Sequence, residues 1–196
     1  MYRCLGLLIA LVPALGLSGA PQTFRDYQCG TTVSVGSERP STLLKDVAAR
    51  ADLIVRARIG RGTSHLAKNP SEIHTTYELV NPQVLFASPS ATRRVSDHPE
   101  SLVLAQRGGT IFRDGKADCP LSMVYEETTA LTPGMDAVLL LVLLDDEFLD
   151  PLFGVFEVRD SAIVLPKAEL NDGEQFKGLA VDRFIGYVLS VKETGR

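Results

Sequence analysis

An uninterrupted run of eight apolar side chains, AVLLLVLL, occupies residues 137–144, between the turn-like segment TPGMD and the acidic segment DDEFLD. The run would be about 12 Å long as a helix and about 26 Å long as a strand, less than the ~30 Å hydrocarbon core of a bilayer. A lone strand is also excluded from lipid because its backbone groups would find no hydrogen-bond partners there. An apolar run of this length between turn signals predicts a strand buried on both faces, in the middle of a folded core.

The leading segment, MYRCLGLLIALVPALGLSGA, has the three parts of a secretory signal peptide. A positively charged head carries Arg3, an apolar stretch covers residues 5–17, and small residues end the segment. The alternative is an N-terminal membrane anchor, but glycine and proline interrupt the apolar stretch, which is shorter than the ~20 residues of a spanning helix. We therefore expect residues 1–20 to be removed and the protein to be exported to the periplasm or the exterior, without stable insertion in a membrane.

The remaining chain, about 176 residues, is long enough to bury a core. We expect one domain at residues 41–196, preceded by an N-terminal arm at 21–40. The formal net charge is −4, and removal of Arg3 with the leader makes the mature chain one unit more negative. An acidic chain without a stripe of basic residues argues against nucleic-acid binding.

Two of the three cysteines, Cys29 and Cys119, stay in the mature chain, whereas Cys4 leaves with the leader. An exported protein matures in an oxidising compartment, where a pair of cysteines is typical of one disulfide. The alternative is two separate buried thiols. A Cys29–Cys119 bridge would tie the N-terminal arm onto the domain.

Residues 41–51, STLLKDVAARA, predict a short helix that Ser41 can cap, because its apolar residues recur at helical spacing. Residues 52–60, DLIVRARIG, alternate as a strand does, so one face is apolar and the other carries Ile54, Arg56 and Arg58. The apolar positions are Leu44, Val47 and Ala48 in the helix and Leu53, Val55, Ala57 and Ile59 in the strand.

Three later segments also predict strands. Residues 73–87 are rich in β-branched and aromatic side chains, and Pro82 within them requires an edge position or a bulge. Residues 101–109 end in the pair Gly108–Gly109, which predicts a bulge or bend at a rim. Residues 155–166 read as a hairpin that turns at Asp160 and Ser161, without the preferred glycine.

The intervening segments 61–72, 88–100 and 110–130 are predicted as surface loops. From Gly178 onward the apolar residues lie near helical spacing, which predicts a closing amphipathic helix. The predicted fold class is therefore mainly β: a small, partly closed barrel of five or six strands with a short N-terminal helix and a C-terminal helix.

The order of five phrases carries a resemblance to a family. They are LLKDVAARADLIVRARIG, IHTTYELVNPQVLF, LVLAQRGGTI, LTPGMDAVLLLVL and GVFEVRDSAIV, and they cover about residues 41–165. In this order the chain resembles a group of secreted bacterial proteins of unassigned function. Its layout is also similar to the netrin-like module, the OB-type barrel of tissue inhibitors of metalloproteinases and of complement proteins. The resemblance implies a five-stranded Greek-key barrel. It transfers no active site, because those inhibitors bind the protease zinc through an N-terminal cysteine, whereas Cys29 lies inside the expected mature chain.

No catalytic, cofactor or metal set is evident from residue spacing. His65, His74 and His98 lack the HExxH or any other metal-ligand pattern, and no G-x-S-x-G elbow is present. Ca²⁺ could be bound by the four acids that follow the apolar run, Asp145, Asp146, Glu147 and Asp150. The D-x-D-x-D-G series of a calcium loop, with its distal Glu, is missing, so a solvated hairpin tip is the simpler interpretation.

Four arginines are the candidate partner contacts: Arg56 and Arg58 on one strand, and Arg93 and Arg94 in the segment 88–100. They could bind an anionic partner, or they could be solvated or paired with nearby acids.

Two function classes remain open. The favoured one is an exported, non-catalytic binding module with an unidentified protein or small-molecule partner, using the predicted loops. The other is an exported hydrolase-type enzyme whose site is assembled from residues distant in sequence.

Overall fold

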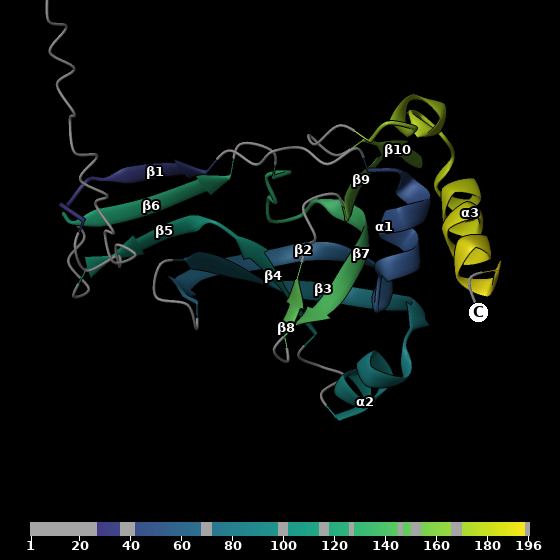
Figure 1. Cartoon of the computed structure of the whole chain (residues 1–196), viewed down its shortest axis with the longest axis horizontal. Coiled ribbons are helices and arrows are strands. Elements are labelled where there is room, and N and C mark those ends of the chain that lie inside the picture. Colours follow the sequence, from purple (N-terminus) through teal and green to yellow (C-terminus); the bar gives the residue numbers. More distant parts are fainter. Residues whose placement is uncertain are drawn as a thin grey trace, which may run out of the picture.

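The structure is a computed structural model that describes residues 27–35, 42–67, 72–97, 102–113, 118–125, 128–144, 147–149, 154–165 and 170–194. The expected leader, Ser41, His98 and the acids Asp145, Asp146 and Asp150 lie outside these ranges. Figure 1 shows two sheets, a small one at the left and a larger one in the centre, and the chain passes directly between them from β4 (Val103–Arg107) to β5 (Gly109–Phe112). Helices α1 (Leu44–Arg50) and α3 (Val181–Thr194) lie at the right, away from the small sheet. Among the described residues, no helix combines the length and apolar character needed to span a bilayer.

Strand β7 (Asp136–Leu144) lies in the middle of the larger sheet, antiparallel to β2 (Leu53–Leu66) on one side and to β9 (Val155–Arg159) on the other. Its side chains from Ala137 to Leu141 are fully buried and alternate between two cores. This confirms the prediction of a strand buried on both faces for that part of the run. Residues 142–144 are less buried, since the β2 pairing ends at Leu141.

The larger sheet has the order β10-β9-β7-β2-β3-β4-β8, with an additional pairing of β8 to β7. Its other members are β3 (Ile73–Ala87), β4 (Val103–Arg107), β8 (Glu147–Leu149) and β10 (Ala162–Val164). The acidic segment after β7 contains the short strand β8, which pairs antiparallel to β7. Strand β8 pairs parallel to β4 at only one residue pair, Ala105 with Leu149. The described strands accordingly form two sheets and no closed barrel.

The smaller sheet has the order β1-β6-β5. Strand β1 (Thr32–Val35) runs parallel to β6 (Pro120–Tyr125), and β5 (Gly109–Phe112) runs antiparallel to it. The predicted loops 61–72 and 110–130 are thus wrong in large part. The β2–β3 hairpin continues to the pair Leu66–Ile73, and β5 and β6 pair because their inward residues cover the buried end of β3.

One face of the larger sheet carries the helices α1 (Leu44–Arg50) and α3 (Val181–Thr194), which pack side by side at the right of Figure 1. A short helical turn, η4 (Gly173–Phe176), lies before α3 and supplies Phe176 to this layer. We call the buried residues of this layer the helix-side core: Leu44, Val47, Ala48, Ala51, Ile54, Val138, Leu140, Phe156, Ile163, Leu170, Phe176, Val181, Phe184 and Val188. Both helices agree with the predicted positions. A residue far along the sequence caps the start of α1: the Leu44 N–H donates a hydrogen bond to Asp172 Oδ1 at 2.9 Å.

The other face of β2 and β7 contributes to a second core, the inner core: Leu53, Val55, Ala57, Ile59, Leu79, Ala91, Leu102, Leu104, Leu131, Ala137, Leu139, Leu141, Phe148 and Val155. The predicted alternation of residues 52–60 is confirmed, since the four inward residues lie here and Ile54 lies in the helix-side core. A third, small-sheet core consists of Ile73, Leu121 and Met123.

The segment 88–100, predicted as a loop, contains helix α2 (Pro89–Asp97) at the bottom of Figure 1. Ser88 starts the helix, because its carbonyl accepts from the Thr92 N–H at 2.8 Å and its hydroxyl from the Ala91 N–H at 3.3 Å. Pro89 suits the first helical position, where an N–H is not needed. The helix is mostly polar, and among its described side chains only Ala91 is fully buried, so it lacks the apolar stripe that would have predicted a helix.

The hairpin of β9 and β10 turns at Asp160 and Ser161, as predicted. Their φ angles of 51° and 62° place both residues in the left-handed region that a two-residue hairpin turn requires. The turn therefore forms without glycine, which Asp tolerates at modest cost.

Candidate functional site

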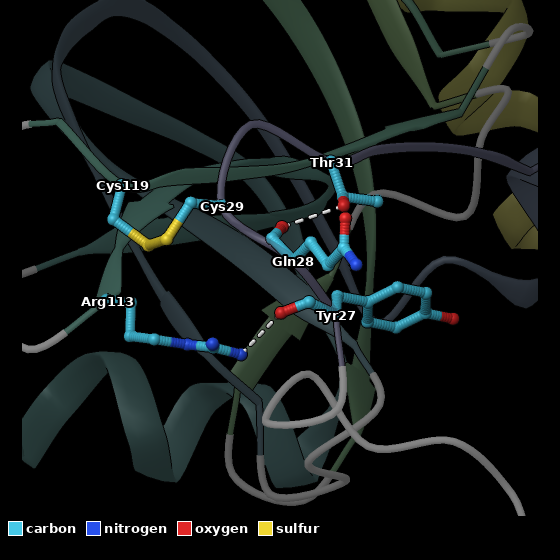
Figure 2. The surroundings of a disulfide bond; sticks show 6 residues. All are labelled: Tyr27, Gln28, Cys29, Thr31, Arg113 and Cys119. Carbon is cyan, nitrogen blue, oxygen red and sulfur yellow. Dashed lines mark hydrogen bonds between the residues drawn. A yellow bond between two sulfur atoms is a disulfide. The ribbon is translucent and has the colours of Figure 1, made fainter.

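The Cys29–Cys119 disulfide is present, as predicted, with a Cα–Cα distance of 4.5 Å (Figure 2). Cys119 is buried and Cys29 is exposed. The bridge stands beside the start of β6, where the Gly30 N–H also donates to the Pro120 carbonyl at 2.8 Å. In Figure 2 the Arg113 guanidinium donates to the Tyr27 carbonyl at 2.6 Å. These contacts hold the described N-terminal segment against the small sheet, so the role of the disulfide is structural.

The four candidate arginines do not form one patch. Arg56 shares its face of β2 with Ile54 of the helix-side core, whereas α2, which carries Arg93 and Arg94, packs on the inner core. Arg56 is paired, with Nη2 at 2.8 Å from Asp136 Oδ2, and this hydrogen bond is the main reason that the pKa of Arg56 is raised. Arg58, Arg93 and Arg94 are exposed.

The two described histidines face each other across β2 and β3, because His65 pairs with His74. His65 therefore lies in a strand and not in the predicted loop. His74 is buried, and its Nε2 lies 3.4 Å from Glu72 Oε2. Within the described ranges no three His, Cys, Asp or Glu residues lie close enough to hold a metal ion.

The chain passes from the larger to the smaller sheet through the bend at Gly108 and Gly109, as the glycine pair predicts. Their φ angles of 100° and 136° favour glycine. A Cβ on Gly109 would collide with the hydroxyls of Thr75 and Ser64, so no larger residue fits the bend without displacing its neighbours.

A buried polar pair lies beside this bend. Thr75 of β3 stands directly opposite Gln106 of β4, between the small-sheet core at Ile73 and the inner core at Leu104. The Thr75 hydroxyl donates to the Gly108 carbonyl at 2.7 Å and lies 2.8 Å from Ser64 Oγ. The Gln106 amide donates to the Thr129 carbonyl at 3.0 Å. Hydrogen bonds of this kind offset the cost of burying polar groups.

A cavity of about 230 Å³ opens at this place, and we call it the junction pocket. Its lining comes from both sheets and from the segment after β6: Thr75, Tyr77, Gln106, Arg107, Gly108, Gly109, Thr110, Met123, Val124, Tyr125, Thr128 and Ala130. None of these described lining residues is Asp, Glu, His or Cys. Residues 126 and 127, between Tyr125 and Thr128, lie outside the described ranges.

The polar groups of the junction pocket are mostly uncharged. Burial raises the pKa of Tyr77 and is also the first cause of the raised pKa of Tyr125, so both phenols keep their protons at neutral pH. The Thr128 hydroxyl is buried and has no hydrogen-bond partner among the described residues. An orphan hydroxyl of this kind is rare in proteins and is usually satisfied by water or a ligand. The pocket thus offers neutral donors and acceptors, two phenol rings and the single charge of Arg107.

A larger cavity, about 640 Å³, lies between the β9–β10 hairpin and η4. Its wall is mostly apolar, and three of its charged lining residues form ion pairs: Arg159 with Glu157 at 2.8 Å, and Lys177 with Glu174 at 3.7 Å. Leu165 and Leu170 on its wall flank residues 166–169, which lie outside the described ranges. Size alone favours this cavity, but the junction pocket has the converging polar groups and the orphan hydroxyl.

The glycine pair in the sequence predicted the bend at Gly108 and Gly109, but no prediction covered the polar residues around it. The available signal was the strand register: Thr75 and Gln106 occupy inward positions where the alternation expects apolar side chains. Thr128 carried no signal, because it lies in the segment 110–130 that was predicted as a loop. Comparisons with protein-family models, curated proteins and solved structures found no match.

Proposed function

We propose that the protein is an exported, non-catalytic binding module that holds a small, uncharged polar ligand in the junction pocket. The observation that carries the proposal is the buried Thr128 hydroxyl, which lacks a partner among the described residues and belongs to a residue that lines a cavity with other neutral polar groups. A ligand that bonds to Thr128 would remove the cost of that buried group.

The chemistry of the lining argues for binding rather than hydrolysis. General acid–base catalysis needs a group that titrates near neutral pH, such as His, Asp or Glu. The described lining residues offer none, and the two tyrosines have raised pKa values. Hard cations are disfavoured by a lining without carboxylates, and most of the polar groups that the described lining offers are neutral.

We further propose that the larger sheet is a distorted OB-type, Greek-key barrel. Strands β7, β2, β3 and β4 are neighbours in this order, which is the 4-1-2-3 arrangement of a Greek key, and β8 touches both β4 and β7. This order supports the resemblance to secreted bacterial proteins and netrin-like modules. The junction pocket lies on β3 and β4, the second and third strands of such a barrel, whose face is a common place for ligands.

Export is supported by the signal-like leader and by the disulfide, since disulfides persist in oxidising compartments. The intact mass of the exported protein tests this part of the proposal. We expect a chain that lacks residues 1 to about 20. A chain that keeps Met1 and stays in the membrane fraction would contradict it.

A thermal-shift screen tests the ligand site. Uncharged sugars, polyols and small amides would be compared with small anions, and we expect a neutral compound to raise Tm by mass action. The same compound should raise Tm much less in Thr128→Val and Tyr77→Phe. Thr63→Val is the matched control, because Thr63 is exposed on β2 outside the pocket. An equal Tm rise in all variants, or no rise with any neutral compound, would overturn the proposal.

A further inference from the structure

A bulge separates Arg56 and Arg58 along the β2–β3 pair. Arg56 pairs with Gln83 and Arg58 pairs with Val80, so Asn81 and Pro82 stand opposite a single β2 residue. This meets the prediction that Pro82 needs a bulge or an edge. Asn81 adopts a φ of 51°, in the left-handed region that few residues other than glycine occupy. Backbone outliers of this kind concentrate at functional sites.

The bulge leaves a hollow of about 170 Å³ that we call the bulge hollow, lined by Arg56, Arg58, Asn81, Gln83 and Asp136 with Ala57 and Val80. It shares no described lining residue with the junction pocket. Three kinds of hydrogen-bond donor therefore meet over a few residues: two guanidinium groups, two side-chain amides and the bulged backbone.

Of the two arginines that line the bulge hollow, Arg56 forms an ion pair with a described residue and Arg58 does not. Asp136 stands opposite Arg58 in the β2–β7 register, but its carboxylate bonds to Arg56 at 2.8 Å. Asp136 is the one acid among the described lining residues, and Arg56 neutralises it. Arg58 is exposed and forms no ion pair or side-chain hydrogen bond within the described part of the chain. Among the described lining residues, Arg58 is therefore the cation without an acid partner, and two side-chain amides lie beside it.

We propose that the bulge hollow binds a carboxylate group, with Arg58 as the charged partner and the amides of Asn81 and Gln83 as additional donors. The planar guanidinium fork matches the two oxygens of a carboxylate. Val80, which is 39 % exposed, gives the hollow an apolar wall for the carbon chain that carries the carboxylate. The site is independent of the ligand in the junction pocket.

Acetate is the probe that tests the proposal. The ¹⁵N-labelled purified protein would be titrated with sodium acetate at constant ionic strength, set with sodium chloride. We expect saturable shifts of the Arg58 Nε–H and Asn81 side-chain amide signals. Arg58→Lys should weaken acetate binding about two- to fivefold, because an ammonium cannot replace the planar fork of the guanidinium.

Arg94→Lys is the matched control, since Arg94 is an exposed arginine on α2, away from the bulge hollow. We expect it to leave acetate binding unchanged. Shifts that grow linearly with acetate, or an Asn81 amide shift that is the same in Arg58→Lys as in the parent, would overturn the proposal. A parallel titration with inorganic phosphate tests the ligand class, and tighter binding of phosphate than of acetate would overturn the assignment to carboxylates.

Discussion

Thr75 and Gln106 face each other across β3 and β4 as a buried polar pair between two apolar cores. Their hydrogen bonds reach backbone carbonyls on either side, at Gly108 and at Thr129. The pair therefore joins the bend between the sheets to the segment that follows β6. It also places polar atoms at the junction pocket, where an all-apolar layer would have continued the core.

Replacing Thr75 by Val tests this relationship. The change removes the donor to the Gly108 carbonyl and the partner of Ser64 at nearly constant volume, so we expect a loss of about 1–3 kcal/mol of unfolding free energy. Urea denaturation measures it. Thr63→Val, at an exposed position in β2, should stay within about 0.5 kcal/mol of the parent. Equal effects of the two changes would contradict the role assigned to Thr75.

The centre of the fold is tested at Leu141, which is fully buried in the inner core. Leu141→Ala should cost about 2–5 kcal/mol through lost burial and the cavity left behind. Leu144 lies three residues later in the same strand and is 50 % exposed, so Leu144→Ala should cost about 1 kcal/mol or less. Chemical denaturation compares the two. A loss under about 0.5 kcal/mol for Leu141→Ala would contradict its burial.

The sequence predicted the elements whose burial follows a period. The run 137–141, the alternation of 53–59 and the helical spacing of α1 and α3 each bury a face, and the structure confirms them. Helix α2 escaped prediction because it lacks an apolar stripe, even though Ser88 and Pro89 suit the start of a helix and Ala91 is buried. The small sheet also escaped, since the pairing of β1 with β6 joins residues about ninety positions apart. The candidate site lies where β6 and the segment after it meet β3 and β4, and of its residues only the glycine bend was predicted from the sequence.

Reduction of the Cys29–Cys119 bridge should loosen β1. The cysteines are 90 residues apart, and closing such a loop stabilises the fold by up to about 4–5 kcal/mol in the chain-entropy model. We expect reduction to lower Tm by several degrees. Calorimetry with and without dithiothreitol measures the change, and a Cys29→Ala, Cys119→Ala variant should show the lower Tm with no response to the reductant. Equal Tm values for the oxidised and reduced protein would contradict a stabilising role.

Alkaline pH should destabilise the protein partly through Tyr77. Burial raises the pKa of Tyr77 above its ordinary value of 10.0, so the folded state holds the proton more tightly than the unfolded state does. This contribution is fully present below about pH 10 and is lost as pH rises through the raised folded-state pKa. Urea denaturation at pH 8 and pH 11 measures it. We expect a smaller fall for Tyr77→Phe than for the parent, and an equal or larger fall in the variant would contradict the assignment.

Replacing Thr128 by Val should affect stability and ligand binding differently. Its hydroxyl is buried without a partner among the described residues, so Thr128→Val removes the cost of desolvating that group at nearly constant volume. We expect the variant to be as stable as the parent or more stable by up to about 1 kcal/mol, measured by urea denaturation without ligand. The same variant should lose the Tm rise that the neutral ligand gives the parent. Sites kept for function often carry such a stability cost. A clear loss of stability in Thr128→Val would mean that the hydroxyl is bonded within the fold and is not held ready for a ligand.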